Sequence, residues 1–208
     1  MIELVVLAAA VALATPTAAD PVGSPARWVR ASDLPRSEDQ TAVTTFDLTI
    51  DQSGRPIHCT VIIASSSDRL DAAVCAAVMK RARFRPARDA TGLPIPSVRR
   101  DRVVWVPDGS GLNSWSKDPD VVVSTPTISN RVRALTEVVI VMDGAGVVDE
   151  CFVAESAGNA ALDDLACAVV QSPEISGPIT DAQGVTLRGV RAFFVGFKPG
   201  TASSVELR

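Results

Sequence analysis

The sequence of 208 residues has no tyrosine and one histidine, and aromatic residues make up only 4% of it. Histidine is the side chain most often used for proton transfer near neutral pH, so catalysis of that kind would depend on His58 alone. His58 stands beside Cys59 in an alternating segment, which indicates an outward-facing strand residue. The hydroxyl cluster at 65–67 has no G-x-S-x-G elbow, and we find neither paired acid/base carboxylates nor a phosphate-binding glycine loop. We therefore expect a protein that is not an enzyme.

Cysteine is also scarce, with four residues that form no C-x-x-C pair and one histidine to accompany them. The common zinc-binding and dithiol redox motifs are therefore absent, and we expect no metal and no other cofactor. The formal net charge of −4 offers no general attraction to nucleic acid, whose binding depends on clustered positive charge. Nucleic acid is not an expected partner.

The amino terminus lacks the Lys or Arg that usually precedes the apolar part of an export signal. Leu4 to Ala14 nevertheless form an unbroken apolar run of 11 residues, and Thr17-Ala18-Ala19 before Asp20 fits a small-residue cleavage site. We interpret residues 1–19 as a signal peptide. The alternative is a short membrane anchor, although the run is shorter than the roughly 20 residues of a spanning helix. Either would carry the rest of the chain out of the cytoplasm, where disulfides are permitted.

The second half of the chain repeats the first. When the sequence is shifted against itself by 92 positions without a gap, 17 of the 62 aligned positions from 46 to 107 are identical. The identities concentrate at turn residues, cysteines and apolar sites, as expected of a tandem duplication. The polar, turn-rich segment between the copies is typical of a linker. We divide the chain into a first domain at 20–107, a linker at 108–124, a second domain at 125–200 and a tail at 201–208.

Each copy has the pattern of two strands, a helix and a last strand. Alternating apolar residues at 45–50 and 57–63 flank a turn that ends in Gly54, which predicts a β-hairpin. Ser67 then fits a helix cap, followed by apolar residues at helical spacing to about Arg83. A strand at 98–106 completes the copy. In the second copy the corresponding hairpin is at 138–153, the helix cap is Asn159, the helix ends before Pro173, and the last strand is at 188–197.

The cysteines keep one spacing in both copies. Cys59 lies in the second strand and Cys75 in the following helix, and Cys151 and Cys167 occupy the matching positions. A helix packed on the sheet can bring the two side chains of one copy together. The simplest pairing is therefore Cys59 with Cys75 and Cys151 with Cys167, although four cysteines allow three pairings. Closing a loop of this size stabilises a protein by roughly 3 kcal/mol.

Several short motifs of the first copy occur together in one known family. They are Phe46-Asp47-Leu48-Thr49-Ile50-Asp51, Gly54-Arg55, Ser65-Ser66, Leu70-Asp71, Phe84-Arg85-Pro86-Ala87 and Gly92-Leu93-Pro94. In this order they resemble the TonB C-terminal domain family, and Trp28 with Asp33-Leu34-Pro35 is similar to the segment before its first strand. The second copy keeps Ser156-Ala157-Gly158, Leu162-Asp163 and Gly184. It lacks the Phe-x-Pro-Ala motif and is interpreted as a degenerate member.

The resemblance implies an α+β fold, with two β-β-α-β units that each have a three-stranded antiparallel sheet and a helix on one face. It also implies a periplasmic protein that binds peptide or protein partners by strand addition, with TonB-dependent outer-membrane transporters as candidates. The edge strand that would receive the peptide is Val98, Arg99, Arg100, Asp101, Arg102, Val103 and Val104. One alternative is a structural envelope protein whose units pair edge to edge. Another is an anchored, truncated energy transducer.

Coupling to an inner-membrane motor complex is not expected, because the segment from Asp20 to Gln40 extends at most roughly 70 Å and is short for a spacer that crosses the periplasm.

Positive charge gathers near the expected edge strand. Eight basic and two acidic residues between Lys80 and Arg102 give a local charge of +6. A solvated face is one interpretation, and attraction of an acidic partner or an anionic lipid surface is the other. The basic patch comprises Lys80, Arg81, Arg83, Arg85 and Arg88.

Overall fold

The computed structural model describes residues 14–33, 35, 41–106, 113–114, 118–126, 128, 135–201 and 204–207. Most of the expected signal peptide and parts of the expected linker and tail lie outside these residues. The described chain is of the α+β class, which confirms that expectation. Its strands form one nine-stranded sheet, with two further two-stranded pairings. None of the described helices is long and apolar enough to span a membrane.

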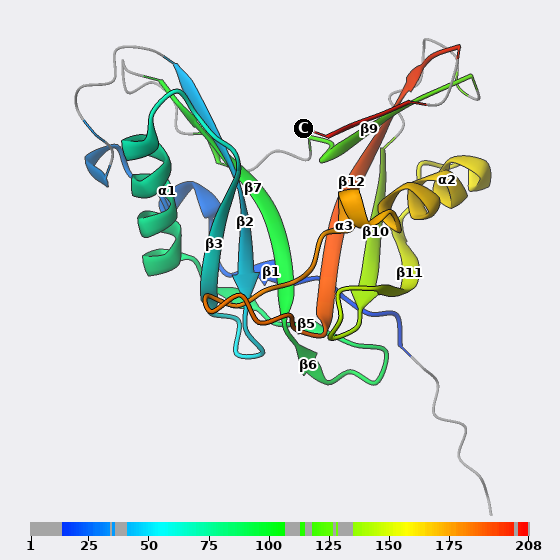
Figure 1. The fold of residues 1–208 in the computed structure, drawn as a ribbon, viewed down its shortest axis with the longest axis horizontal. Coiled ribbons are helices and arrows are strands. Elements are labelled where there is room, and N and C mark those ends of the chain that lie inside the picture. The colour runs from blue at the N-terminus through cyan, green and yellow to red at the C-terminus, as the bar shows by residue number, and fades with distance from the viewer. Residues whose placement is uncertain are drawn as a thin grey trace, which may run out of the picture.

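The first half of the chain forms a hairpin, a helix and a return strand (Figure 1). These are β2 (Ala42–Ile50), β3 (Pro56–Ile63), α1 (Asp68–Arg81) and β7 (Ser97–Trp105). The side-chain oxygen of Ser67 caps α1 by accepting from the Leu70 amide. The helix buries Leu70 and Val74 in a core that also contains Phe46, Leu48 and Ile50. Short elements surround this unit: β1 (Asp20–Pro21), 3₁₀ turns at Pro25–Arg27 and Ala31–Asp33, β4 (Phe84–Arg85), β5 (Ala87–Arg88) and β6 (Pro94–Ile95).

The second half contains the same order of main elements. These are β10 (Leu135–Met142), β11 (Val148–Glu155), α2 (Ala160–Val170) and β12 (Gly189–Pro199), with α3 (Pro173–Ser176) after α2. Asn159 caps α2, and Leu162, Ala166 and Val170 are buried in a core with Ile140 and Phe193. As predicted, α2 ends before Pro173.

The aspartate of the Leu-Asp pair near the start of each helix makes equivalent hydrogen bonds in the two halves. The carboxylate of Asp71 accepts from the Thr44 hydroxyl at 2.6 Å and from the Ser65 amide at 3.1 Å. The carboxylate of Asp163 accepts from the Thr136 hydroxyl at 2.8 Å and from the Ala157 amide at 3.0 Å. In both halves this aspartate therefore ties the start of the helix to the first strand.

The expected linker and tail contain strands. β8 (Asn113–Ser114) pairs with β7, and β9 (Val121–Thr125) pairs in parallel with β12. β13 (Ser204–Leu207) then pairs with β9 in the antiparallel sense. The unbroken run Val121-Val122-Val123 is buried within this sheet. The segment predicted to be a linker from its polarity, and the segment predicted to be a tail, therefore contribute strands to the sheet.

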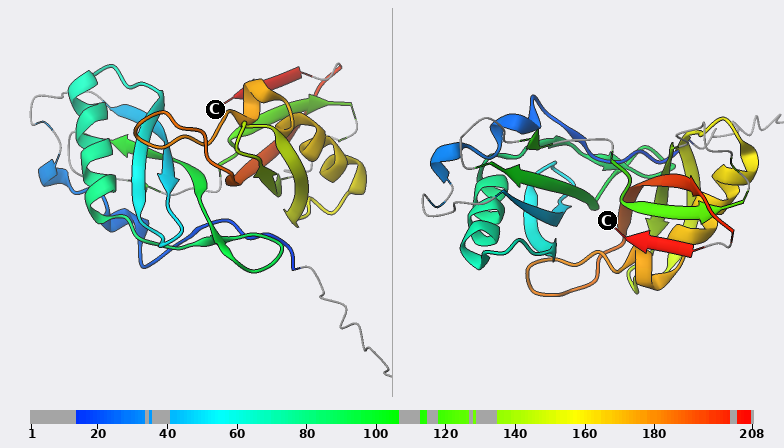
Figure 2. Two further views of the ribbon diagram at one scale, coloured as in Figure 1. Left: turned by 60° about the horizontal axis from the view of Figure 1, so that its bottom comes forward. Right: turned by 90° about the horizontal axis from the view of Figure 1, so that it is seen from above.

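The two halves join through their last strands. β12 and β7 pair in parallel at Val190 with Ser97 and at Arg191 with Val98, so the strand order is β11-β10-β12-β7-β2-β3. Figure 1 shows two arms that meet at this pairing and diverge beyond it, and Figure 2 shows α1 and α2 at opposite ends of the molecule. Val139 and Val141 of β10 face the core of the first half, whereas Val138 and Ile140 face α2. Both faces of β10 are therefore buried.

Candidate interaction surfaces

The disulfide pairing is as predicted. Cys59 is bonded to Cys75 and Cys151 to Cys167, with Cα–Cα distances of 5.7 and 5.8 Å and a sequence separation of 16 in both. The first bond ties β3 to α1, and the second ties β11 to α2. Each hairpin is therefore covalently fixed to the helix that covers it.

The prediction that residues 98–104 form an open edge strand is wrong at both ends of this segment. β7 pairs along its whole length with β2, from Ser97 with Ile50 to Trp105 with Ala42. On its other side, β12 pairs at Ser97 and Val98, and β8 pairs at Val103 and Val104. The prediction failed because β12 of the second half and β8 of the expected linker pair with the side of β7 that was expected to be open. Strand addition along Val98–Val104 would have to displace them.

The charged residues in the middle of β7 take part in contacts within the chain. Arg99 donates to the Ala19 carbonyl at 3.3 Å, Arg100 donates to Asp47 at 2.8 Å, and Arg102 forms an ion pair with Asp118. Asp101 accepts a hydrogen bond from the Arg102 amide. The three arginines therefore hold other segments against β7.

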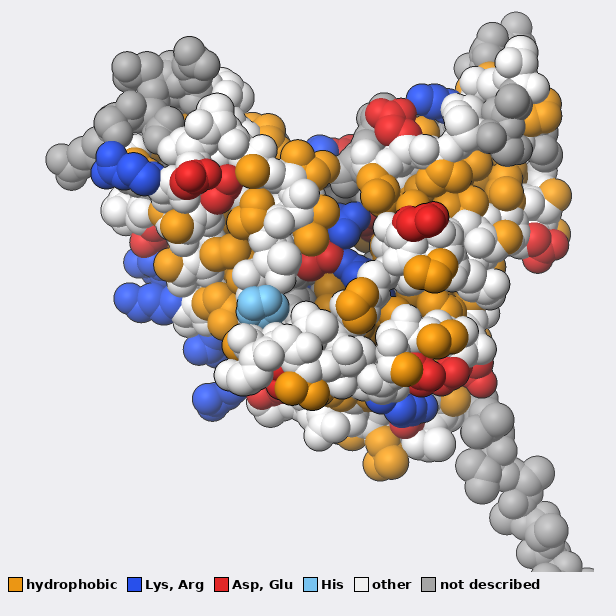
Figure 3. All heavy atoms as spheres, viewed as in Figure 1, with side chains coloured by type: hydrophobic (Ala, Val, Ile, Leu, Met, Phe, Trp, Pro, Cys, Tyr) orange, Lys and Arg blue, Asp and Glu red, His pale blue; other side chains and the backbone are white. Residues whose placement is uncertain are grey.

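Asp47 lies at the centre of the junction between the halves. Its carboxylate accepts from Arg100 of β7 and from Arg191 of β12, and Arg191 also donates to the Ser176 carbonyl. Burial disfavours the charged carboxylate, but the guanidinium groups of Arg191 and Arg100 outweigh it and lower the pKa of Asp47. Acidic and basic side chains are visible in the notch between the arms in Figure 3.

Asp120 lies near this cluster, and its pKa is shifted in the opposite direction from that of Asp47. Burial raises its pKa to about 6, although its carboxylate accepts the Phe194 amide at 2.8 Å and feels the positive charge of Arg100 and Arg191. The carboxylate of Asp47 opposes its ionisation as well. The junction therefore contains one carboxyl group whose pKa is lowered and one whose pKa is raised to about 6.

Two loops cross from one half to the other. The Thr180 carbonyl accepts from the Thr49 hydroxyl of β2 at 2.9 Å, and Asp89 lies 3.7 Å from the Arg188 guanidinium. The Pro96 carbonyl accepts from the Val190 amide at 2.9 Å. Both loops contain the repeated Asp-Ala-x-Gly motif, so this motif shapes the segments that interlock the halves.

The predicted basic patch is partly a structural feature. Lys80, Arg83, Arg85 and Arg88 are exposed, and Figure 3 shows basic side chains along the side of the molecule that α1 forms. Arg81 instead donates to both oxygens of Asp33, at 2.5 and 2.8 Å, and to the Trp28 carbonyl at 2.6 Å. It holds the N-terminal segment against α1, where the Trp28 ring packs on Phe84 at 5.1 Å between ring centroids.

The outer strands of the six-strand path are β3 and β11. Among the described residues, β3 pairs with β2 and β11 pairs with β10, each on one side only. β3 carries no Asp, Glu, Lys or Arg, and Ile62 and Ile63 are 40% and 43% exposed. β11 carries Asp149, Glu150 and Glu155. Sequence reasoning missed this relocation of the open edge because the pairing of β12 with β7 is not visible in local patterns.

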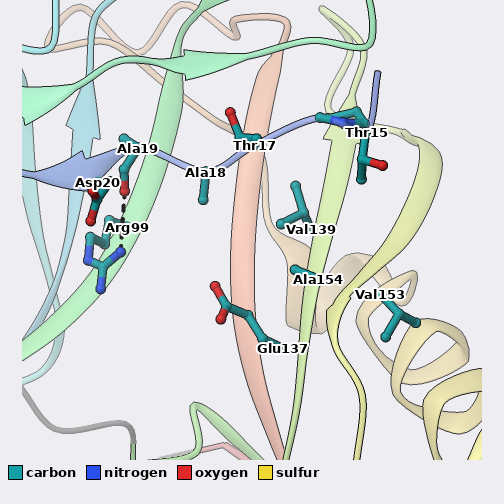
Figure 4. Close-up of a pocket in the computed structure, with 11 residues that line it drawn as sticks. Thr15, Thr17, Ala18, Ala19, Asp20, Arg99, Glu137, Val139, Val153 and Ala154 are labelled. Carbon is teal, nitrogen blue, oxygen red and sulfur yellow. Dashed lines mark hydrogen bonds between the residues drawn. The ribbon is translucent and has the colours of Figure 1, made fainter. Parts of the chain in front are cut away.

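A pocket of about 480 Å³ lies between the N-terminal segment and the second half. It is lined by the residues Thr15 to Asp20 on one side and by Glu137, Val139, Val153 and Ala154 of β10 and β11 on the other, with Arg99 at one end. Figure 4 shows the chain from Thr15 to Asp20 running across the strands of the second half. Among the described residues, no cluster of three or more His, Cys, Asp or Glu side chains forms a metal site.

Comparison with known proteins finds a similarity in the first half of the chain. No curated protein and no solved structure matches the chain. One family model does, described as Gram-negative bacterial TonB protein C-terminal, over residues 33–100. The matched segment runs from the aspartate that pairs with Arg81, through β2, β3 and α1, into β7. Residues 33–100 of this chain are therefore similar to the C-terminal domain of Gram-negative bacterial TonB proteins.

Proposed function

We propose that this protein is a non-catalytic, periplasmic member of the TonB C-terminal family that binds an extended segment of a protein partner by strand addition to β3. The observation that supports this most directly is that β3 is an uncharged edge within the segment that matches the family. The two disulfides support an oxidising compartment.

The chemistry of β3 suits main-chain recognition. An edge strand offers unpaired N–H and C=O groups to an incoming strand, and proteins usually protect such edges with charges or proline. β3 has a proline only at its start, Pro56, and β-branched residues at Val61, Ile62 and Ile63. The three carboxylates of β11 are the kind of charged residue that usually protects an edge strand from pairing with another chain. Of the two outer strands, β3 is therefore the better receptor.

The charge near β3 indicates the character of the partner. The Phe84 amide donates to the Gly54 carbonyl at 2.9 Å, so the exposed Arg83 lies beside the turn that leads into β3, together with Arg85, which is ion-paired with Asp20. Basic side chains at one end of the strand would attract acidic residues that flank a docking segment. The periplasmic segments of TonB-dependent outer-membrane transporters are candidate partners.

We further propose that the second half is a degenerate copy of the same domain with a supporting role. It repeats the helix-start aspartate and the disulfide of the first half, while β12 covers the start of β7. In this arrangement the second half rigidifies the first and leaves β3 as the receptor edge.

A second candidate is a structural envelope protein with no peptide ligand. It is favoured by the pairing of β12 with β7, because the two halves then satisfy each other's edges. The two candidates differ in one respect, which is whether the amides of β3 gain protection from a partner.

The test is hydrogen exchange of the full exported protein, with and without synthetic N-terminal peptides of outer-membrane transporters. Strand addition predicts slower exchange at alternate amides of β3. The variant Ile62→Lys should weaken peptide binding at least tenfold. Val153→Lys on β11, which has the same 40% exposure, is the matched control and should bind as the wild type does. Peptide binding that protects β11 or β7 instead of β3, or no binding by any peptide, would contradict the proposal.

A further inference from the structure

The segment from Ala14 to Val22 makes main-chain hydrogen bonds with residues 83–90 at several points along its length. The Ala14 amide donates to the Ala90 carbonyl, Thr17 and Arg88 exchange two main-chain hydrogen bonds at 2.9 and 3.0 Å, and the Val22 amide donates to the Arg83 carbonyl. Between them, β1 pairs with β4 at Asp20 with Arg85 and at Pro21 with Phe84. The pairings at Thr17 and at Asp20 lie on either side of the bond between Ala19 and Asp20 and keep the same register.

The same segment is also buried. Pro16 is buried and Ala19 is 2% exposed. Ala19 belongs to the first core, Ala18 packs against that core, and the Ala19 carbonyl accepts from Arg99. Because Val139 and Ala192 of the second half contact the same core, the segment helps to cover the face of β10 and β12 opposite α2. Figure 4 shows Ala19 next to Arg99, with Thr17 and Thr15 nearer the strands of the second half.

Cleavage before Asp20 would conflict with this arrangement. It would remove the Thr17 pairing and the buried side chain of Ala19. It would also place a new α-ammonium group on Asp20, whose carboxylate pairs with Arg85 and whose preceding carbonyl accepts from Arg99. A positive charge introduced beside two guanidinium groups is unfavourable.

A second small-residue site lies five residues earlier. Ala12-Leu13-Ala14 has alanine at both positions that a signal peptidase reads. Leu4 to Val11 remain as an apolar region of 8 residues, within the range of roughly 7–15 found in export signals. The new amino terminus would be Thr15, which is exposed.

We propose that the export signal is cleaved between Ala14 and Thr15, so that Thr15–Ala19 remain in the mature protein as a structural segment. This inference rests on the interpretation of the first residues as a signal. It does not depend on partner binding, so the two proposals can fail separately.

The test is mass spectrometry of the N-terminal peptide of the exported protein. A peptide that begins at Thr15 is expected, whereas one that begins at Asp20 or at Met1 would overturn the proposal. Two variants sharpen the result, because a bulky residue directly before the cut blocks processing. Ala14→Tyr should abolish the Thr15 product, and Ala19→Tyr should leave it unchanged. Loss of processing in Ala19→Tyr would contradict the assignment.

Processing precedes folding, so both variants can be read even if the Ala19→Tyr substitution disturbs the core. A separate measurement tests the structural role of the segment. Protein that begins at Thr15 should have a higher Tm than protein that begins at Asp20, because the second form lacks the Thr17 pairing and the Ala19 side chain. Equal Tm values would show that the segment is dispensable and would count against its retention.

Discussion

Asp47 and Arg191 are 144 positions apart and form a buried ion pair across the junction of the two halves. Arg100 completes the cluster from β7, so one carboxylate connects β2, β7 and β12. Parallel pairing of β12 with β7 involves only two residue pairs. Side-chain charges therefore contribute to the junction where main-chain pairing is short.

Replacing Asp47 with asparagine should be strongly destabilising. The substitution leaves the buried guanidinium groups of Arg100 and Arg191 without a compensating charge, a change that typically costs about 3–5 kcal/mol. Urea unfolding followed by circular dichroism gives the loss in free energy of unfolding. Asp149→Asn is the matched control, because Asp149 is exposed on β11 and its replacement should change stability by less than about 0.5 kcal/mol. A loss below about 1 kcal/mol for Asp47→Asn would show that the cluster contributes little.

Asp120 should make stability depend on pH between about 4 and 6. Its folded pKa of about 6 lies above the ordinary aspartate value of 3.8, so the folded state binds more protons than the unfolded state in this range. The contribution of Asp120 is fully present below its unfolded pKa and is lost as the pH rises through the folded value. The loss should be on the order of 1–3 kcal/mol.

The measurement compares wild type with Asp120→Asn, which keeps an oxygen that can accept the Phe194 amide. The stability of the wild type relative to this variant should fall as the pH rises from about 4 to about 7. The carboxylates with lowered pKa that do not interact with Asp120, such as Asp33, are present in both proteins and cancel in the difference. A difference that does not change with pH would refute the assignment.

Removal of either disulfide should lower the free energy of unfolding by about the same amount. Both close loops with a sequence separation of 16 and join a hairpin to its helix, and a loop of this length is associated with about 3 kcal/mol. The double variants Cys59→Ala/Cys75→Ala and Cys151→Ala/Cys167→Ala should therefore unfold at similarly reduced urea concentrations. If only one of them is destabilised, the two halves do not depend on their disulfides in the same way.

The sequence was sufficient for the local elements. Alternation predicted β2 and β3, helical spacing with Ser67 and Asn159 predicted α1 and α2, and the repeated cysteine positions predicted both disulfides. The strands and helices depend on residues close together in the chain. The disulfides could be predicted because the same pair of cysteine positions occurs in both halves.

The junction could not be predicted in the same way. The ion pair of Asp47 with Arg191 and the pairing of Val190 with Ser97 join distant residues whose local patterns do not specify a partner. Two signals were available. The unbroken apolar run Val138 to Met142 is typical of a strand buried on both faces, and Val121-Val122-Val123 is an unusual composition for a linker. Both indicate contacts outside the three-stranded unit.

Gly54 is the glycine whose replacement should reveal how the hairpin turn is held. It has φ of +79°, and a Cβ at this position would overlap the main-chain carbonyl of Phe84, which cannot move without disturbing β4. Gly92 has φ of +82°, but a Cβ there meets nothing within 4 Å. Both Gly54→Ala and Gly92→Ala carry the strain of positive φ, of roughly 1 kcal/mol. Gly54→Ala alone adds the overlap, so it should be less stable than Gly92→Ala by about 1 kcal/mol or more in urea unfolding. Equal losses would mean that the turn can move away from Phe84, and the position of Arg83 and Arg85 beside β3 would then not be fixed by this contact.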